Sequence, residues 1–381
     1  MSFRSISVEL TSRLTKDEKQ EQGIFFTPKE ARDRVFEILD KHHIKPRSIL
    51  EPSFGSGEFL EDLYSKYPKA EVTGVELNPT LFNSVDRPNL HNIDFLTYVG
   101  THDLILGNPP YFVMEKSEDT ARCQTGRPNM FVQFLYNAVH HHLTENGVLA
   151  FVLPTSLFNC LYYELMRRYL FEHTTILAAE VLPGKYIDTA QETFALVLRK
   201  GKRNNNYFVE IGDNVYLTPY FRELRELRKK TKTLAELGYE VKTGDVVWNQ
   251  EKEKLSDEGT LLIYSSNFSK GVLSLGDLKP PKKQYIQGFK RPGLSGKTIL
   301  INRGYGNTSY KITPVLVDYP SYYAENHVNV IIPKTPSALS RIEKVYASLR
   351  DPRTAKFLQY FVGNGALSKS ELENCLPIWL D

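Results

Sequence analysis

Short apolar runs alternate with helix-like stretches through the first half of the chain, and this alternation restricts the fold more than any other feature. Such alternation is typical of a mostly parallel sheet with helices on both faces. The expected strands are Ser48–Glu51, Val72–Glu76, Leu104–Gly107, Val148–Leu153, Leu177–Leu182 and Thr193–Arg199. The expected helices are Pro28–His42, Glu58–Lys66, Phe131–Leu143 and Leu157–Leu170. Only residues 183–192 separate the last two strands, too few for a helical crossover, so we expect a Rossmann-like α/β sheet whose last strand is antiparallel.

The pattern changes after the polar segment Gly201–Asn206. Beyond it the sequence becomes irregular and richer in Gly, Pro and Tyr. A chain of 381 residues is long enough for two domains. We therefore expect one domain over residues 1–210 and a second, mixed α+β domain over residues 211–381.

The charge of the chain divides at the same place. Residues 1–210 carry 23 Lys and Arg against 27 Asp and Glu, whereas residues 211–381 carry 25 against 18. Within residues 270–311 basic side chains are interleaved with aromatic ones, a composition that suits a polyanion with stackable bases. A charge run can also be a solvated face. The candidate nucleic-acid contacts are Lys282, Lys283, Lys290, Arg291 and Arg303.

Composition excludes several classes of protein. Cys123, Cys160 and Cys375 lie far apart without a Cys-x-x-Cys pair, so we expect neither disulfides nor a zinc site, and a cytoplasmic location. The three histidines at His140–His142 point in different directions on a helix, so we expect no metal. No apolar run has the length of a membrane span, and the first residues do not resemble a signal peptide.

The tetrapeptide Asn108-Pro109-Pro110-Tyr111 follows the expected strand Leu104–Gly107. Ligands of open α/β sheets bind at the carboxyl ends of strands. Two prolines remove N–H donors, which leaves the local carbonyls as acceptors. The Asn108 oxygen and the Pro109 carbonyl can each accept one hydrogen of a planar –NH2 group, while Tyr111 stacks on the ring that carries it. A plain proline turn is the alternative, but the combination favours a site that grips an exocyclic amine.

A second set of residues indicates a cofactor site without phosphate. The turn from Glu51 to Gly57 closes one expected strand and opens a helix, and its glycines allow close backbone approach. Phe59 and Leu60 stand where a dinucleotide fingerprint needs its third glycine. Glu51 puts a negative charge where an ammonium, rather than a pyrophosphate, would bind, and Glu76 at the next strand end can take ribose hydroxyls. S-adenosylmethionine has both groups and no phosphate. Asp94 is placed to accept from an adenine amino group, with Phe95 against the ring.

These motifs, in this order, resemble the gamma class of N6-adenine DNA methyltransferases of restriction-modification systems. The resemblance covers roughly residues 20–200 and rests on Phe25–Pro28, Glu51–Gly57, Glu76, Asp94-Phe95 and Asn108–Tyr111. It implies a cofactor-binding catalytic domain over residues 1–210 and a target-recognition domain over residues 211–381. The second domain carries a looser likeness at Leu237–Gly244 and Asn364–Leu372.

The resemblance also implies roles for individual residues. S-adenosylmethionine would contact Phe26, Thr27, Pro28, Glu51, Ser53, Gly55, Gly57, Glu76, Asp94, Phe95 and Asn108. The catalytic residues would be Asn108, Pro109, Pro110 and Tyr111, and the target base would stack on Tyr111 and on either Tyr186 or Phe194.

The expected reaction is methyl transfer from S-adenosylmethionine to N6 of an adenine flipped out of double-stranded DNA. We expect a monomer of prokaryotic or viral origin, with a separate cognate restriction endonuclease as a candidate partner. Two alternatives share the tetrapeptide: methylation of an RNA adenine and methylation of a glutamine side-chain amide in a protein. The basic, aromatic second half of the chain favours DNA over both. A DNA-binding subunit with a vestigial cofactor fold is a third alternative, which the intact tetrapeptide disfavours.

Overall fold

The computed structural model describes residues 3–13, 15, 18–19, 22–183, 192–268, 271–276, 278–303, 311–361 and 367–381. It divides into two compact units, each treated separately below. One consists of Met1–Glu210 with Asn214–Phe221, and the other of Ile211–Asp213 with Arg222–Asp381. Among the described residues, none of the helices combines the length and the apolar character that a bilayer crossing requires.

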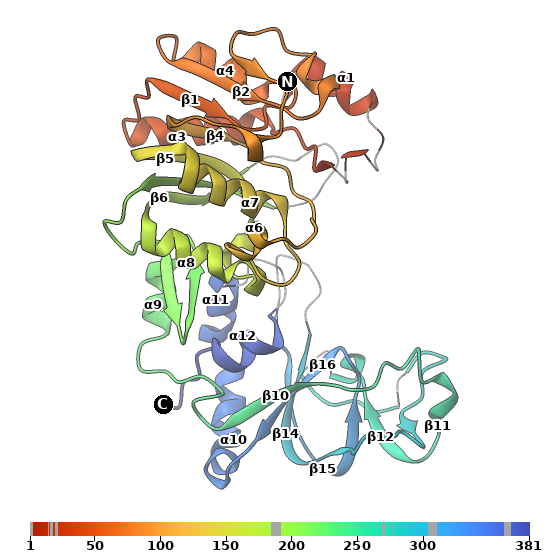
Figure 1. Ribbon diagram of the computed structural model, residues 1–381. Coiled ribbons are helices and arrows are strands. Elements are labelled where there is room, and N and C mark those ends of the chain that lie inside the picture. The colour runs from red at the N-terminus through yellow and green to blue at the C-terminus, as the bar shows by residue number, and fades with distance from the viewer. Residues whose placement is uncertain are drawn as a thin grey trace. The chain divides into compact units, whose positions relative to one another are not determined.

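The first unit is built on one mixed sheet, shown in Figure 1, whose strand order within the described residues is β3-β2-β1-β4-β5-β7-β6. Its strands are β1 (Ser48–Glu51), β2 (Glu71–Val75), β3 (Leu90–His91), β4 (His102–Gly107), β5 (Leu143–Pro154), β6 (Thr174–Val181) and β7 (Thr193–Lys200). Strands β1 to β5 pair in parallel, whereas β7 is antiparallel to both β5 and β6. The predicted α/β sheet with an antiparallel last strand is therefore confirmed.

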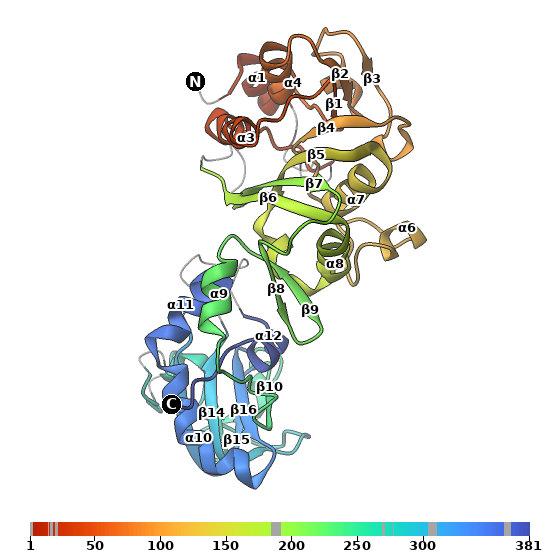
Figure 2. The same cartoon turned by 90° about the vertical axis from the view of Figure 1, so that its left-hand side faces the viewer.

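Alternate residues of the central strands face opposite sides of this sheet, as the two-residue period of a strand requires. On β1, Ile49 packs into a core with helices α3 and α4, whereas its neighbour Leu50 packs into a core with α7 and α8. Figure 2 shows the two pairs of helices on the two faces. The helices of this unit are α1 (Ser5–Arg13), α3 (Lys29–Lys41), α4 (Glu58–Lys66), α5 (Pro79–Phe82), α6 (Glu118–Ala121), α7 (Met130–Asn137) and α8 (Glu164–His173). A hairpin of β8 (Phe208–Ile211) and β9 (Asn214–Leu217) follows the sheet.

Two of the expected helices differ from the structure. The helix expected over residues 157–170 begins only at Glu164, after two short 3-10 turns. The reason is Arg167, whose guanidinium takes the carbonyls of Leu157 and Cys160 at 3.2 and 2.7 Å and so removes them from a helical ladder. The helix expected over residues 131–143 ends as a π-helical turn at Ala138–His142, where β5 begins at Leu143.

The second unit contains a separate sheet, mostly antiparallel, with the order β10-β16-β14-β15-β12-β13-β11 within the described residues. Its strands are β10 (Tyr239–Thr243), β11 (Leu255–Ser256), β12 (Thr260–Ile263), β13 (Tyr285–Ile286), β14 (Leu294–Asn302), β15 (Pro314–Ala324) and β16 (Val328–Pro333). Its helices are α9 (Phe221–Leu227), which begins in the first unit, α10 (Pro336–Leu349), α11 (Pro352–Phe361) and α12 (Lys369–Asn374). Helix α10 packs on β14, β15 and β16. The unit is therefore mixed α+β, as expected.

Candidate active site

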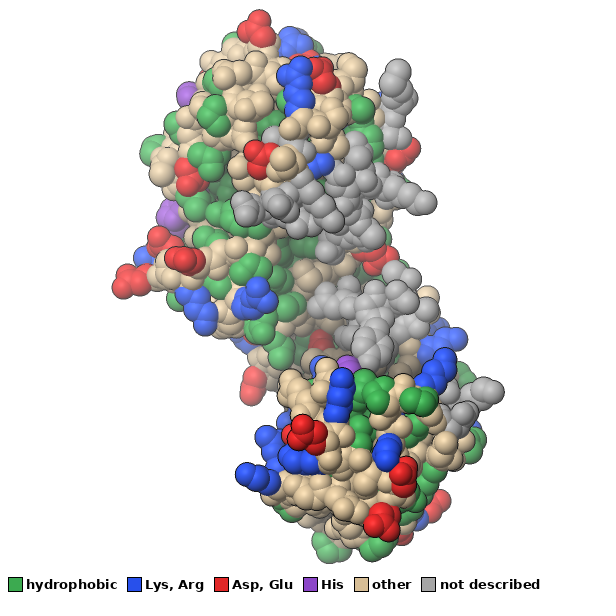
Figure 3. Space-filling model, turned by 90° about the vertical axis from the view of Figure 1, so that its right-hand side faces the viewer, with side chains coloured by type: hydrophobic (Ala, Val, Ile, Leu, Met, Phe, Trp, Pro, Cys, Tyr) green, Lys and Arg blue, Asp and Glu red, His purple; other side chains and the backbone are tan. Residues whose placement is uncertain are grey.

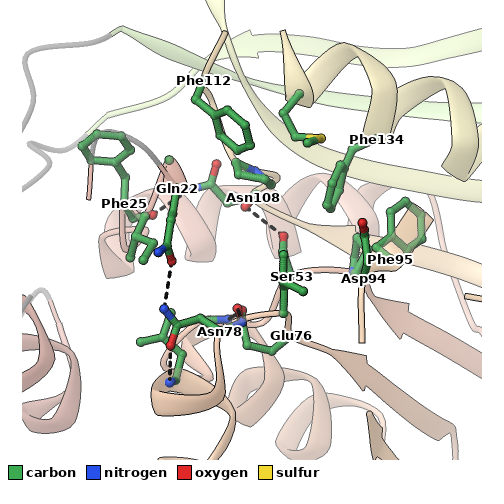
Figure 4. Close-up of a pocket in the computed structure, with 18 of the residues that line it drawn as sticks. Gln22, Phe25, Ser53, Glu76, Asn78, Asp94, Phe95, Asn108, Phe112 and Phe134 are labelled. Carbon is green, nitrogen blue, oxygen red and sulfur yellow. Dashed lines mark hydrogen bonds between the residues drawn. The ribbon is translucent and has the colours of Figure 1, made fainter. Parts of the chain in front are cut away.

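Three neighbouring parallel strands, β2, β1 and β4, end at the same edge of the first sheet. Glu76 follows β2, the turn beginning at Pro52 follows β1, and Asn108 follows β4. A cavity of about 190 Å³ lies there, and Figure 4 shows its wall. It is lined by Gln22, Gly23, Ile24, Phe25, Phe26, Pro52, Ser53, Gly55, Glu76, Leu77, Asn78, Leu81, Asp94, Phe95, Asn108, Pro110, Phe112, Met130 and Phe134.

Glu76 is buried and held at both carboxylate oxygens. Its Oε2 accepts from the Gly55 backbone N–H at 2.8 Å, and its Oε1 accepts from the Asn78 N–H at 2.8 Å. Burial raises the pKa of this carboxyl, while the backbone N–H groups of Asn78 and Gly55 act in the opposite direction. A carboxylate can accept about four hydrogen bonds, so beside the backbone N–H groups of Asn78, Gly55 and Leu77 it can still receive a hydroxyl group. Glu76 is thus fixed in place and chemically suited to a ribose.

Glu51 is a buried carboxyl without its full set of partners. It is 2 % exposed, and no hydrogen bond to its Oε2 is present among the described residues. Burial raises the pKa of Glu51 well above its usual range, and the nearby carboxyls of Asp62 and Glu76 raise it further. Leaving a buried polar atom unpaired is costly, so a bound group with hydrogens to donate would stabilise this position. Glu51 itself does not line the cavity, but the next residues, Pro52 and Ser53, do.

Asp94 and Phe95 form another part of the cavity wall. Asp94 caps a short 3-10 turn (Phe95–Thr97), its Oδ1 accepting from the Leu96 N–H at 2.9 Å. Phe95 is 1 % exposed and packs on Phe134, with ring centroids 4.8 Å apart. The rings of Phe95 and Phe134 thus form one apolar wall beside the Asp94 carboxylate, as Figure 4 shows.

The side-chain amide of Asn108 has partners at both ends. Its Nδ2 donates to the Phe25 carbonyl at 2.9 Å, and its Oδ1 accepts from the Tyr111 hydroxyl at 2.5 Å. The same hydroxyl lies 2.6 Å from the Val152 carbonyl of β5. The Ser53 hydroxyl donates to the Asn108 backbone carbonyl at 3.3 Å, which links the first turn to the tetrapeptide. The amide is therefore oriented before any substrate binds.

The residues before α3 divide into those that line the cavity and those that do not. Phe26 lines it, whereas Thr27 and Pro28 are buried outside the lining. The Thr27 carbonyl accepts from Arg32, at 2.7 Å, and Pro28 caps the helix. Gly57 is also outside the lining: it begins α4 with φ 77°, and a Cβ there would meet Val85 and Arg4. The predicted cofactor contacts of Thr27, Pro28 and Gly57 are thus not among the lining residues of this cavity.

The candidates for base stacking differ in their access. Tyr111 is half-buried and packs edge-to-face on Phe131, with centroids 5.8 Å apart. Phe194 is fully buried and lies 4.3 Å from the Phe158 ring centroid, so it presents no open face to a base. The structure therefore argues against Phe194. Tyr186 lies outside the described residues.

The predicted basic residues of the second unit lie in the segments next to β13 and β14. Figure 3 shows Lys and Arg side chains on this unit with Asp and Glu side chains between them. Four of the five have partners within the protein. The Lys282 ammonium lies over the rings of Trp248 and Tyr264. Lys283 forms an ion pair with Asp257 at 2.8 Å and Arg291 one with Asp245 at 2.7 Å, while Arg303 donates a hydrogen bond to the Asn326 carbonyl at 3.0 Å. Lys290 is exposed. Their contact with DNA stays a prediction.

Several residues at the site belong to none of the predicted motifs. Helix α1 and the preceding Arg4 contact the glycine turn: the Ser7 and Ser56 hydroxyls are 2.8 Å apart, and Arg4 donates to the Gly57 carbonyl at 3.2 Å. Gly23 and Phe134 line the cavity. The nearest available signal is position: Gly23 directly precedes the Phe-Phe-Thr-Pro segment, and Phe134 lies on the helix after the tetrapeptide. No group of three or more metal-ligating side chains is present among the described residues.

Comparison with known proteins identifies the family. Residues 60–186 match the model of the Eco57I restriction-modification methylase family. The type II methyltransferase M.CvrRI of Paramecium bursaria Chlorella virus XZ-6E is 30% identical over 397 residues, which cover 99% of each chain. A tRNA1(Val) (adenine(37)-N6)-methyltransferase of Vibrio campbellii is 28% identical over 125 residues, covering 29% of this chain and 52% of the relative.

A solved structure shares the fold. The type IIL restriction-modification enzyme MmeI, determined in complex with DNA, aligns with a TM-score of 0.52 at 12% identity over 91% of this chain and 66% of MmeI. The full-length match to M.CvrRI extends through both units, so family membership applies to the whole chain. S-adenosylmethionine is the methyl donor of this family. The chain belongs to the DNA methyltransferases of type II restriction-modification systems.

Proposed function

We propose that this DNA methyltransferase is specific for adenine and transfers the methyl group to N6 of a base flipped out of double-stranded DNA. The observation that carries the proposal is the orientation of the Asn108 amide. Its nitrogen is committed to the Phe25 carbonyl, so its oxygen is the end available to a substrate. The Tyr111 hydroxyl uses one lone pair of that oxygen, and a second remains for an amine hydrogen.

Adenine N6 is a poor nucleophile because its lone pair is delocalised into the ring. We infer that Asn108 Oδ1 and the Pro109 carbonyl each accept one of its two hydrogens. This arrangement favours a pyramidal nitrogen and stabilises the positive charge that develops there during transfer. Oriented dipoles that match developing charge are a large catalytic term in many enzymes. The carbon–sulfur bond of the donor breaks as the carbon–nitrogen bond forms, which leaves a neutral thioether. No strong base is required, because the alkylated nitrogen is acidic and can release its proton to water.

The residues at the cavity fit S-adenosylmethionine. Glu76 would hold the ribose hydroxyls and Asp94 the adenine amino group. Glu51 directly precedes two residues that line the cavity, and its buried Oε2 has no hydrogen-bond partner among the described residues. This oxygen would take the amino group of the methionine part. When bound, this cofactor supplies an electrophilic methyl group on a sulfonium. The apolar wall of Phe95 and Phe134 would exclude water from one side of the adenine ring.

A stacked base in a duplex cannot reach Asn108, so the target must be flipped out at a cost of a few kcal/mol. Stacking on an aromatic ring offsets this by about 1–3 kcal/mol per base. Tyr111 is the described candidate for that ring. The basic residues beside β13 and β14 would then hold the duplex through its phosphates, independently of the base that is read.

Two relatives favour one of the alternative substrates. The tRNA adenine-N6 methyltransferase matches only part of the chain, whereas the type II methyltransferase matches the second unit as well. This distribution supports adenine as the base and DNA as the polymer. A glutamine amide would leave the second unit without a role.

The test is a substrate competition with tritiated S-adenosylmethionine. The full-length protein is offered duplex DNA, RNA and a protein extract, and labelled nucleosides are then separated by chromatography. We expect label in N6-methyldeoxyadenosine from the duplex alone. Label in N4-methylcytosine would reject the choice of base, and label in RNA or protein would reject the choice of polymer.

A further inference from the structure

The backbone at Gly23 lies against the catalytic tetrapeptide more closely than a side chain would allow. Gly23 has φ +64°, and a Cβ placed on it would lie 2.6 Å from the Tyr111 backbone nitrogen and 3.0 Å from Pro110 Cβ. Neither atom can move away cheaply, because one is backbone and the other belongs to a proline ring. At this position the fold therefore requires glycine for two independent reasons, its φ angle and its lack of a side chain.

This close approach has a consequence two residues later. Phe25 places its carbonyl 2.9 Å from Asn108 Nδ2, as the view of Phe25 and Asn108 in Figure 4 shows. The amide nitrogen is a donor and the amide oxygen an acceptor. If the amide rotated by half a turn, its NH2 would face the incoming amine, donor against donor. The Phe25 carbonyl therefore selects the orientation that the reaction needs.

We propose that Gly23 is a positioning residue for methyl transfer, which acts on the Asn108 amide through the Phe25 carbonyl. This inference rests on the proposed function, since it takes Asn108 Oδ1 to be the acceptor for the target amine. Gly23 itself supplies no chemical group. Its contribution is to let the backbone that carries the Phe25 carbonyl approach closely enough to fix the position of Asn108 Oδ1. A misplacement of about 1 Å at a reacting group can lower the rate by about 100-fold.

The experiment replaces Gly23 in the full-length protein and separates rate from binding. In Gly23→Ala we expect the single-turnover methylation rate to fall by about 10- to 100-fold. The dissociation constants for S-adenosylmethionine and for duplex DNA should change by less than about threefold. Gly23 lines the cavity but supplies none of the polar groups assigned to either ligand, and a Cβ there would lie against Tyr111 and Pro110. A general structural defect would instead weaken binding and lower thermal stability together.

The matched control is Gly212→Ala. Gly212 also has a left-handed backbone, with φ +57°, but a Cβ there would meet nothing within 4 Å. It therefore carries the same backbone strain without the contact, and its methylation rate should stay within about twofold of wild type. Gly23→Asn supplies the converse control, because Asn tolerates positive φ but carries a Cβ. It should lose activity as Gly23→Ala does.

Two outcomes would overturn the inference: a Gly23→Ala rate equal to that of Gly212→Ala, or a wild-type rate in Gly23→Asn. If the Gly23 variants do not fold, Asn108→Asp tests the same contact. It keeps two acceptor oxygens but has no hydrogen for the Phe25 carbonyl, so we expect a loss of at least about 10-fold, and a wild-type rate would overturn the inference. If the wild-type enzyme itself methylates no adenine, the result contradicts the proposed function rather than the role of Gly23.

Discussion

In the first unit the polar side chains of the site lie at strand ends and form hydrogen bonds with the main chain. In the second unit the basic side chains lie in connecting segments, where several form ion pairs with carboxylates or donate hydrogen bonds to carbonyls. Glu76 and Asn108 each have both ends of the side-chain group engaged. Lys283 and Arg291 form ion pairs that are largely exposed. Exposed pairs contribute little to stability and exchange readily for other partners.

This difference matches the roles that we propose for the two units. Methyl transfer depends on the position of a few atoms, so its residues need rigid supports. Binding to a phosphate backbone depends on the number of charges and is read without precise geometry. Substitutions should therefore have large, specific effects in the first unit and small, graded effects in the second.

The largest effect is expected for Asn108→Ala. Without the amide oxygen the target amine loses one of its two acceptors, and we expect methylation to fall by about 100- to 1,000-fold, as when a single oriented dipole is removed from an active site. Affinity for S-adenosylmethionine, measured by calorimetry, should stay within a few-fold. Retention of activity would remove the proposed mechanism.

Glu76→Ala should act on the cofactor rather than on the base. It removes the acceptor for the Gly55 N–H as well as the proposed ribose contacts, so we expect cofactor affinity to fall by about 10- to 100-fold, the equivalent of one or two charge-assisted hydrogen bonds. Glu71→Ala is the control, since Glu71 is exposed at the other end of the same strand. Equal effects of the two variants in the same calorimetric titration would contradict the assignment of Glu76.

We expect low pH to reduce the free energy of unfolding of the first unit through His102. Burial lowers the pKa of His102 to about 4, with the neighbouring His142 as a further cause. Between about pH 6.5 and 4 this histidine is protonated in the unfolded chain but stays neutral in the folded unit. The free energy of unfolding therefore falls as the pH drops from about 6.5 towards 4. For this one group the loss is about 2 kcal/mol between pH 7.5 and 5.

Urea unfolding of the wild type and of His102→Gln, at pH 7.5 and at pH 5, measures this contribution. The variant keeps an acceptor for the Tyr98 hydroxyl, which His102 contacts at 2.9 Å, but has no group that titrates in this range. We expect a smaller difference between the two pH values in the variant. An equal difference would assign the acid sensitivity to other groups.

The smallest effect is expected for Lys290→Ala in the second unit. Losing one phosphate contact should weaken duplex binding by a few-fold at low salt and reduce the slope of log affinity against log salt by about one. Lys69→Ala, an exposed lysine of the first unit, should change neither quantity. A loss of more than about 100-fold at Lys290 would show that the second unit also relies on precisely placed side chains.

The sequence was most informative where local patterns decide the structure. The strand Ser48–Glu51 and the helix Glu58–Lys66 were predicted with the bounds that the structure has. The placement of Glu76 and Asn108 at the same edge of one sheet followed from the parallel arrangement of the strands that precede them. By contrast, β3 has only two residues, too few to show a period, and the start of α8 depends on the reach of Arg167 to carbonyls earlier in the chain.

Long-range contacts account for most of what the sequence did not predict. The second sheet pairs β12 in parallel with β15, strands far apart in the chain, and no local pattern specifies that partner. At the site, Gly23 and Phe25 act through their backbones, which any residue shares, so their identities say little about their contacts. Phe194 was a candidate because it is aromatic and lies in the right region, and only packing shows that its ring is enclosed by Phe158 and the core.

The carboxyl of Glu51 has a consequence for how the enzyme takes up its methyl donor. Burial raises the pKa of this carboxyl, whereas the proposed pairing with the donor's ammonium would lower it. Loading the donor would therefore expel a proton to solvent. Affinity for the donor would then rise with pH, and the heat of binding would vary with the ionisation enthalpy of the buffer.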